Sequence, residues 1–244
     1  MGKAIVVFGA GGRAGRAAVS EARRRGHQVT AVVRDTGRYQ GLVDDGVEVL
    51  AGDVTDRVSV AALAAGHDAA IHAAAVYGEG TDPDAFFTAA AHALAEGLGS
   101  VGVPRLVAVG LSTLLPGVDG ARPVDAVSFP AEYLSFSWAH ATGLDSLRAQ
   151  SEAKRVGDTR GMDWVWLAPA GDFDHEGGRT GHYTIRPHGD PSARVSYPDF
   201  AIALLDEIDA PTDTSFHRHM QVAIAQDPAA ASQEEWPDTY RAQR

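Results

Sequence analysis

Short apolar, β-branched segments alternate along the chain with longer segments in which apolar positions recur at a helical period. The short segments predict strands at 3–8, 28–33, 47–52, 68–75, 105–110 and 163–169. Between them the pattern predicts helices at about 13–25, 57–65, 84–101 and 130–155, the last one broken or bent near Gly143. Because strands separated by helices pair in parallel under helices on both faces, we expect an α/β fold with a doubly wound, central parallel sheet.

The alternation stops after the fifth predicted strand. Residues 111–130 form a Pro- and Gly-containing loop that is longer than ordinary connections in a compact domain. Farther on, "GGRTGHYTI" predicts a small hairpin or loop, "ARVSYPDFAIALLDEI" a short strand leading into a helix, and "HRHMQVAI" a last strand. We expect one domain over 1–225, a small C-terminal substrate-side subregion built from about 111–145 and 170–200, and a polar tail at 226–244.

Composition and charge narrow the class of protein. The 244 residues are 45% hydrophobic and 22% charged, with no cysteine and a formal charge of −11. No apolar run approaches the ~20 residues that span a bilayer, and the first residues predict a strand instead of a signal peptide, so we expect a cytoplasmic protein without membrane contact. The acidic balance disfavours nucleic-acid partners, and the basic run Arg23–Arg25 is explained by its place at a predicted helix end. Both a monomer and an oligomer are compatible with the sequence.

The segment "VVFGAGGRAGRAAVSEARRRGHQVTAVVRD" places a glycine-rich turn between a strand and a helix. Two registers fit: Gly9-x-Gly11-x-x-Ala14 matches the Rossmann dinucleotide fingerprint, and Gly9-x-x-Gly12-x-x-Gly15 matches the spacing of extended and atypical short-chain dehydrogenases. Either register turns the backbone tightly and exposes N–H groups at a helix N-terminus to a pyrophosphate. The turn therefore predicts dinucleotide binding on a Rossmann fold.

The second predicted strand ends in Val33-Arg34-Asp35, where a Rossmann fold ordinarily carries an acidic residue for the ribose hydroxyls. The Arg34 guanidinium matches a 2′-phosphate, so it predicts a preference for NADPH over NADH. We expect Arg13 to add a second charge-assisted contact to the same phosphate. The alternative is that both arginines are solvated surface residues, and Asp35 leaves dual specificity open.

Residues after the third and fourth predicted strands complete the expected cofactor site. Asp53 is placed to meet an adenine amino group or, alternatively, to cap the next helix, and Val54 follows it. Ala73 and Ala74 are small enough to lie against the dinucleotide.

Several motifs together resemble one family, namely the glycine-turn segment, "AGDVTD", "LVAVGLSTL", "FPAEY", "DWVWLAPAGDF", "GGRTGHY" and "RVSYPDFAIALLDEI". Over about residues 3–224 the chain resembles the NAD(P)H-binding, atypical short-chain dehydrogenase/reductase proteins, which include the NmrA-like group and flavin reductases of the biliverdin reductase B type. The resemblance implies a Rossmann fold that holds NADP(H) and acts on a small molecule, without fixing the substrate. Gly11, where relatives usually have threonine, and Gly110-Leu111-Ser112, where they often have glycine and alanine, depart from the pattern.

Members of the larger superfamily commonly use a tyrosine as proton donor, with a lysine four residues later. This chain has only Lys3 and Lys154, and Gln150 stands four residues before the second, so the sequence contains no Tyr-x-x-x-Lys pair. The usual ketoreductase mechanism is therefore not expected.

Other side chains are candidates for the chemistry. Ser112 follows the fifth strand at the sheet edge where ligands of open α/β folds bind, although a hydroxyl there equally well caps the loop. Tyr133, Ser137 and His140 are spaced to share one helical face, and either Tyr133 or His140 is a candidate proton donor. The alternative is that this face packs on the domain.

Two further groups have simpler interpretations. Asp172, Asp174, His175 and Glu176 include metal-ligand residue types, but a divalent site would need ligands converging from elsewhere, so we predict no metal site. Trp164 and Trp166 alternate on the sixth strand, which predicts core positions on one face of the sheet.

Three functions remain open. The first is an NADPH-dependent oxidoreductase that reduces a small carbonyl, quinone, flavin or conjugated acceptor. The second is an NmrA-like regulatory protein that binds NADP(H) without turnover, and the third is a redox-neutral cyclase or isomerase on the same fold.

Overall fold

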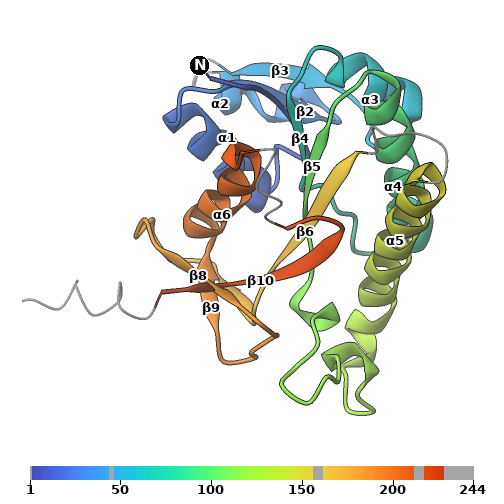
Figure 1. Ribbon diagram of the computed structural model, residues 1–244, viewed down its shortest axis with the longest axis vertical. Helices are drawn as coiled ribbons and strands as arrows, with labels where there is room; N and C mark the ends of the chain where they lie inside the picture. The colour runs from blue at the N-terminus through green and yellow to red at the C-terminus, as the bar shows by residue number, and fades with distance from the viewer. Residues whose placement is uncertain (1, 44–46, 156–161, 212–216, 228–244) are drawn as a thin grey trace, which may run out of the picture.

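An eight-stranded sheet forms the centre of the protein (Figure 1). The computed structural model describes residues 2–43, 47–155, 162–211 and 217–227. In spatial order the strands are β3 (Glu48–Ala51), β2 (Gln28–Val33), β1 (Ala4–Phe8), β4 (Ala69–His72), β5 (Arg105–Val109), β6 (Asp163–Pro169), β10 (Met220–Gln226) and β8 (Tyr183–Arg186). All neighbouring strands are parallel except β8, which pairs antiparallel with β10. The expected α/β fold around a mostly parallel sheet is confirmed.

Helices cover both faces of this sheet. Figure 1 shows α1 (Arg13–Arg24) and α6 (Tyr197–Asp209) on one side, and α3 (Arg57–Ala64), α4 (Pro83–Ser100) and α5 (Ala131–Arg155) on the other. Successive side chains of a strand point to opposite faces, so β1 contributes Ile5 and Val7 to the first core and Val6 and Phe8 to the second. All four are fully buried, and each such burial stabilises the fold by about 1.5–3 kcal/mol. Continuous apolar strands are thus explained by a sheet with two buried faces.

Helix α5 corrects one expectation. It runs without a break from Ala131 to Arg155, through the predicted interruption at Gly143. A Cβ atom at Gly143 would lie 2.9 Å from the Phe87 Cβ and 3.0 Å from the Phe87 carbonyl oxygen on α4. This glycine therefore permits close packing of two helices and does not end one.

The C-terminal region differs in part from its predicted pairing. The predicted short strand and helix are β9 (Arg194–Ser196) and α6, whereas β8 is not part of a local hairpin, because its partner is β10. A separate two-stranded parallel sheet joins β9 to β7 (Asp172–Asp174). The remaining short elements are η1 (Thr36–Arg38), α2 (Gln40–Val43), η2 (Ser112–Leu114) and η3 (Pro123–Asp125). The tail from 228 onward lies outside the described residues.

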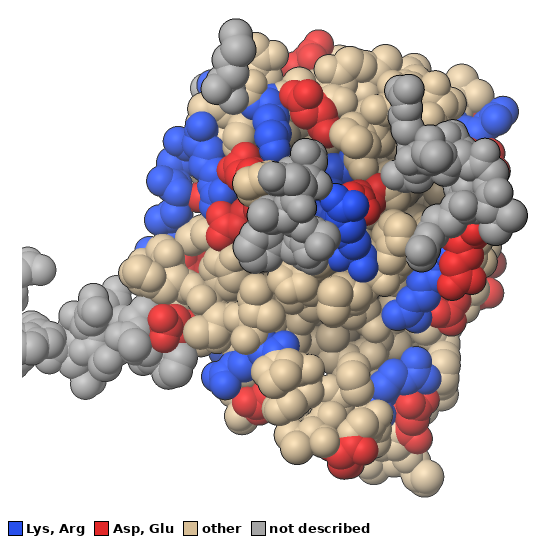
Figure 2. Space-filling model, viewed as in Figure 1, with Lys and Arg blue, Asp and Glu red and all other residues tan. Residues whose placement is uncertain are grey.

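The basic run at the end of α1 is largely neutralised by neighbouring carboxylates. The buried Glu21 carboxylate pairs with Arg24 at 2.6 Å and Arg25 at 2.9 Å, and Arg25 also reaches Asp206 and Asp209 of α6. Burial alone would raise the pKa of Glu21, but hydrogen bonds from Arg24, Arg179 and Arg25 lower it to about 2. Figure 2 likewise shows basic and acidic side chains side by side on this face. Arg25 thereby joins the end of α1 to α6.

Among the described residues, no helix is both long and apolar enough to cross a membrane. Trp164 and Trp166 of β6 are both buried in the core beneath α4 and α5, as their alternation predicted.

Candidate functional site

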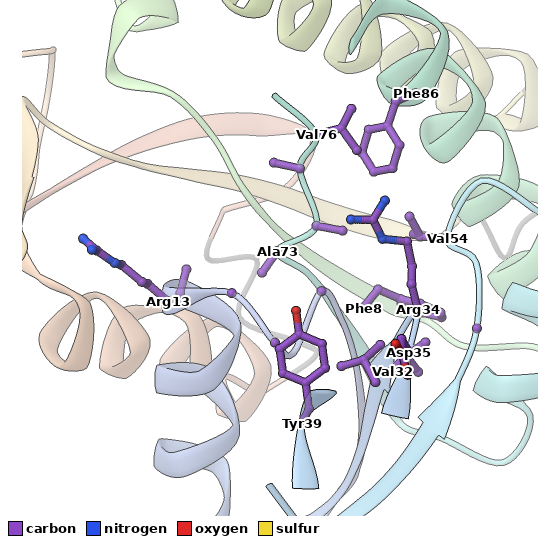
Figure 3. A pocket seen from close by; sticks show the side chains of 18 of the residues that line it. Phe8, Arg13, Val32, Arg34, Asp35, Tyr39, Val54, Ala73, Val76 and Phe86 are labelled. Atoms are coloured by element: carbon purple, nitrogen blue, oxygen red, sulfur yellow. The ribbon is translucent and has the colours of Figure 1, made fainter. Parts of the chain in front are cut away.

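A cleft of about 790 Å³ opens at the carboxyl ends of the central strands. This is the edge at which open α/β sheets bind ligands, and the volume is in the ordinary range of ligand sites. Figure 3 shows side chains from several elements around it. The lining consists of Phe8, Gly9, Gly11–Ala14, Val32–Asp35, Arg38, Tyr39, Gly52–Val54, Ala73–Tyr77, Thr81, Phe86, Phe173 and Tyr197.

The glycine turn forms the floor of this cleft. Gly9 has a φ of +83°, and a Cβ there would lie 2.3 Å from the backbone nitrogen of Ala74. A Cβ at Gly15 would lie 2.2 Å from the carbonyl oxygen of Gly9. Gly9 belongs to both registers, and the contact at Gly15 favours the register that ends in Gly15. Gly15 does not line the cleft; it lets α1 approach the turn.

The N-terminus of α1 faces the cleft with free donors. Its N-cap is Gly12, which has no side chain to accept from the first N–H groups, and no acidic residue stands in the first turn. Unpaired N–H groups at a helix N-terminus bind phosphate, because the helix dipole adds to their hydrogen bonds. The turn and the helix therefore fit the pyrophosphate of a dinucleotide.

Arginines and a tyrosine line the cleft beyond β2. Arg34 and Arg38 both border it, and among the described residues neither side chain forms an ion pair. Asp35 also borders it, but its Oδ1 accepts a hydrogen bond from the Gly37 N–H at 3.0 Å and caps η1. The Tyr39 ring lies against Gly11, where a Cβ would come within 2.4 Å of it. This end of the cleft is therefore cationic and has an aromatic wall.

The predicted residues after β3 and β4 also border the cleft. Asp53, Val54, Ala73 and Ala74 all line it. Asp53 does not cap the next helix, because its Oδ1 accepts from the N–H and hydroxyl of Thr55 while another residue, Asp56, caps α3. The sheet strand β4 ends at His72, earlier than expected, since the following alanines leave the sheet to form the cleft wall.

Arg13 lines the cleft, but its side chain lies away from Arg34. Figure 3 places its side chain on the opposite side of the cleft from Arg34, with Ala73 and Tyr39 between them. Its guanidinium contacts the Nδ1 of His175 and the hydroxyl of Tyr197. In this arrangement the first residue of α1 points toward the start of α6, and the phosphate contact shared with Arg34 stays a prediction.

None of the three predicted catalytic side chains lines the cleft. Ser112 lies on η2, and Tyr133 is 59% exposed on α5. His140 is buried, with its ring 3.7 Å from the Phe87 ring, and burial followed by the nearby His72 lowers its pKa to about 3. The shared helical face is only partly found, because Ser137 and His140 are buried and Tyr133 is not. Catalytic roles for these residues stay predictions.

Arg38, Tyr39, Phe173 and Tyr197 are among the lining residues that the sequence analysis did not predict. Arg38 and Tyr39 follow Arg34 closely, so a second cation near the strand end was the available signal. Phe173 and Tyr197 come from β7 and the start of α6, and no local pattern brings them together. Their rings stack at 4.2 Å with an angle of 12°.

The acidic segment after β6 has local hydrogen bonds. Asp174 accepts from the N–H groups of Glu176 and Gly177, and His175 contacts Arg13. Within the described residues, no three His, Asp or Glu side chains lie together as metal ligands would.

Comparison with known proteins identifies the family. Residues 9–211 match the model of the NAD(P)H-binding family. The chain belongs to this family. Its membership confirms the resemblance to atypical short-chain dehydrogenases and flavin reductases, and it agrees with a cleft built for a nicotinamide dinucleotide.

The chain is also similar to individual proteins of known sequence or structure. The chain is 32% identical over 216 residues to YwnB of Bacillus subtilis (strain 168), covering 85% of this chain and 92% of YwnB. SP1627 of Streptococcus pneumoniae TIGR4, a proposed NADH-flavin reductase, is 27% identical with a TM-score of 0.72, covering 93% of this chain and 100% of SP1627. A proposed epimerase of Bacteroides thetaiotaomicron is also 27% identical, with a TM-score of 0.74 and coverage of 93% and 98%.

Proposed function

We propose that this protein is an NADPH-dependent oxidoreductase that passes hydride to a small conjugated acceptor such as a flavin, a quinone or a carbonyl compound. The observation that carries the NADPH preference is the arrangement after β2. Arg34 and Arg38 border the cleft, while the Asp35 carboxylate is engaged by the Gly37 N–H. A guanidinium binds a phosphate through charge-assisted hydrogen bonds, whereas a free carboxylate in that place would favour unphosphorylated ribose.

Each part of the cleft has a role in this proposal. The Gly9–Gly12 turn and the N-terminus of α1 hold the pyrophosphate, and Arg34 with Arg38 holds the 2′-phosphate. Val32 and Val54 give the adenine an apolar surface beside Asp53. When bound, the reduced dinucleotide supplies the hydride. The acceptor then lies at the other end of the cleft, bordered by Ala73–Tyr77, Phe173 and Tyr197.

Two observations support a conjugated acceptor. The sequence lacks the Tyr-x-x-x-Lys pair that drives ordinary carbonyl reduction, and an acceptor whose reduced form is a stabilised anion makes less demand on a proton donor. SP1627, a proposed NADH-flavin reductase, shares 27% identity with this chain over nearly its whole length.

The test is NADPH consumption by the purified protein with FMN, a benzoquinone and an aromatic aldehyde as separate acceptors. We expect protein-dependent oxidation of NADPH with at least one conjugated acceptor, at a rate above that with NADH. Tight NADPH binding without consumption with any acceptor would contradict the oxidoreductase and support a nucleotide-binding regulator or a redox-neutral enzyme. Consumption that is faster with NADH would contradict the cofactor preference alone.

A further inference from the structure

The end of the cleft away from Arg34 holds a compact group of functional side chains. Phe173 and Tyr197 stack there as parallel rings. The Tyr197 hydroxyl lies 3.5 Å from the Nδ1 of His175, and Arg13 contacts both of these residues. The group joins the first residue of α1, the loop after β7 and the first residue of α6. Three separate elements thus present a tyrosine hydroxyl and a guanidinium at one place.

The charge at this place is not balanced by an ion pair. Among the described residues, Arg13 forms no salt bridge with a carboxylate, although it lines the cleft. A cation without a counter-ion beside a hydroxyl stabilises the deprotonated form of that hydroxyl. The positive charge of Arg13 therefore acts on its two neighbours, His175 and Tyr197, and on any ligand in the cleft.

The surroundings act on Tyr197 in both directions. The pKa of Tyr197 lies above its ordinary value, because burial raises it and the nearby Asp172 and Tyr77 add to this, while the hydrogen bond and positive charge of Arg13 oppose the rise. His175 also faces the hydroxyl. Without Arg13, burial and the two neighbours would act unopposed, so the guanidinium holds this phenol nearer to the range in which it can give up a proton.

We propose that Tyr197 is the proton donor to the reduced acceptor, and that Arg13 positions and activates it. The inference rests on the proposed oxidoreductase function. A pyrophosphate held at the turn and a 2′-phosphate held at Arg34 would direct the reacting half of the dinucleotide toward the other end of the cleft, which Tyr197 lines. A cation beside a tyrosine is the chemical arrangement that the absent Tyr-x-x-x-Lys pair would have supplied, here built from α1 and α6.

The proposed reaction adds a hydride and then a proton to the acceptor. Bound NADPH would supply the hydride and leave as NADP⁺, and the electrophilic atom of the acceptor would gain the new bond and the two electrons. The acceptor anion takes the proton of the Tyr197 hydroxyl. The tyrosinate, held by the Arg13 guanidinium, regains a proton from water before the next turnover.

The first arm of the test measures ionisation and needs no turnover. Tyrosinate absorbance is followed against pH in the wild-type protein and in Y197F, and the difference isolates Tyr197. The same subtraction is made for R13Q against the R13Q/Y197F double variant. We expect the pKa of Tyr197 to be higher in R13Q than in the wild type. An unchanged pKa would overturn the role of Arg13.

The second arm measures turnover with an acceptor that the wild-type protein reduces. We expect Y197F to lower kcat by ~10²-fold or more, with the NADPH Kd within about twofold of wild type, because general acid catalysis contributes 10²–10⁴-fold. The matched control is Y183F, which removes the hydroxyl that hydrogen-bonds Asp206 outside the cleft and should leave kcat unchanged.

The outcomes separate the two proposals. Wild-type consumption of NADPH together with full activity of Y197F would overturn Tyr197 as donor and leave the oxidoreductase function intact. No wild-type consumption with any acceptor would overturn both.

Discussion

The Oδ1 of Asp35 accepts a hydrogen bond from the Gly37 backbone N–H at 3.0 Å and thereby caps the short helix η1. An acidic side chain at the end of the second strand of a Rossmann fold ordinarily binds ribose hydroxyls. In this protein Asp35 instead stabilises the loop after β2. Arg38 belongs to that loop and borders the same edge of the cleft as Arg34. The hydrogen bond between Asp35 and Gly37 is thus connected to the proposed preference for NADPH.

Removing either cation at this edge should selectively weaken binding of the phosphorylated cofactor. We expect R34Q and R38Q each to raise the NADPH Kd by about tenfold or more, equivalent to ~1.4 kcal/mol, and to change the NADH Kd little. Isothermal titration with both cofactors measures this. R148Q is the matched control, because Arg148 is exposed on α5 and pairs with Asp145 away from the cleft. Equal losses for NADPH and NADH would show that the arginines do not recognise the 2′-phosphate.

The close contact of Gly15 with the turn predicts that adding one methyl group, in G15A, lowers the stability of the fold. In G15A the new Cβ would meet the Gly9 carbonyl oxygen at 2.2 Å and the Ala10 Cα at 2.8 Å, and backbone atoms yield little. Overpacking of this kind costs about 1–3 kcal/mol, so we expect Tm to fall by roughly 2–10 °C and dinucleotide binding to weaken. G178A is the control, since nothing lies within 4 Å of that Cβ. Equal melting temperatures for the two variants would refute the close packing of α1 on the turn.

The buried histidines His72 and His140 predict how stability depends on pH. Burial lowers the pKa of His72 to about 4, and burial followed by the nearby His72 lowers that of His140 to about 3. The ordinary value in an unfolded chain is about 6.5. Below pH 6.5 the unfolded chain therefore takes up protons that the folded chain refuses, so stability present above pH 6.5 is lost as pH falls toward 4.

The variant H140L removes one of these two groups. Between pH 7 and pH 5 the wild-type free energy of unfolding should fall by ~2 kcal/mol more than that of H140L, at about 1.4 kcal/mol per pH unit below 6.5. Urea unfolding at the two pH values measures the difference, and H92L, which changes an exposed histidine of α4, should behave like the wild type. Identical pH dependence in wild type and H140L would mean that His140 is not held neutral.

The sequence predicted those features of the structure that depend on interactions between neighbouring residues or on a pattern that repeats along the chain. The alternation of apolar strands and helices predicted the doubly wound sheet, because burial on both faces makes each inner strand continuously apolar. The glycine turn was predictable for the same reason: Gly9, Gly12 and Gly15 are close in sequence and meet one another in space. Arg34 was found because its place at the end of a strand fixes which edge of the sheet it occupies.

Tertiary packing decided what the sequence did not predict. Arg13 is one residue past the turn, yet its direction depends on where α6 packs, more than 180 residues later. His140 has the spacing of an active-site face, but Phe87 and Trp166 close over it from other elements. The place of Tyr197 in the cleft could not be predicted from the sequence, because it depends on how β7 and α1 pack beside the start of α6.

The most direct test of the NADPH preference is a fluorescence titration of the wild-type protein with NADPH and with NADH in one low-salt buffer. We expect NADPH to bind at least about tenfold more tightly, and we expect added salt to reduce this ratio because an exposed phosphate–guanidinium contact is screened. Equal Kd values for the two cofactors, or tighter binding of NADH, would contradict recognition of the 2′-phosphate by Arg34 and Arg38.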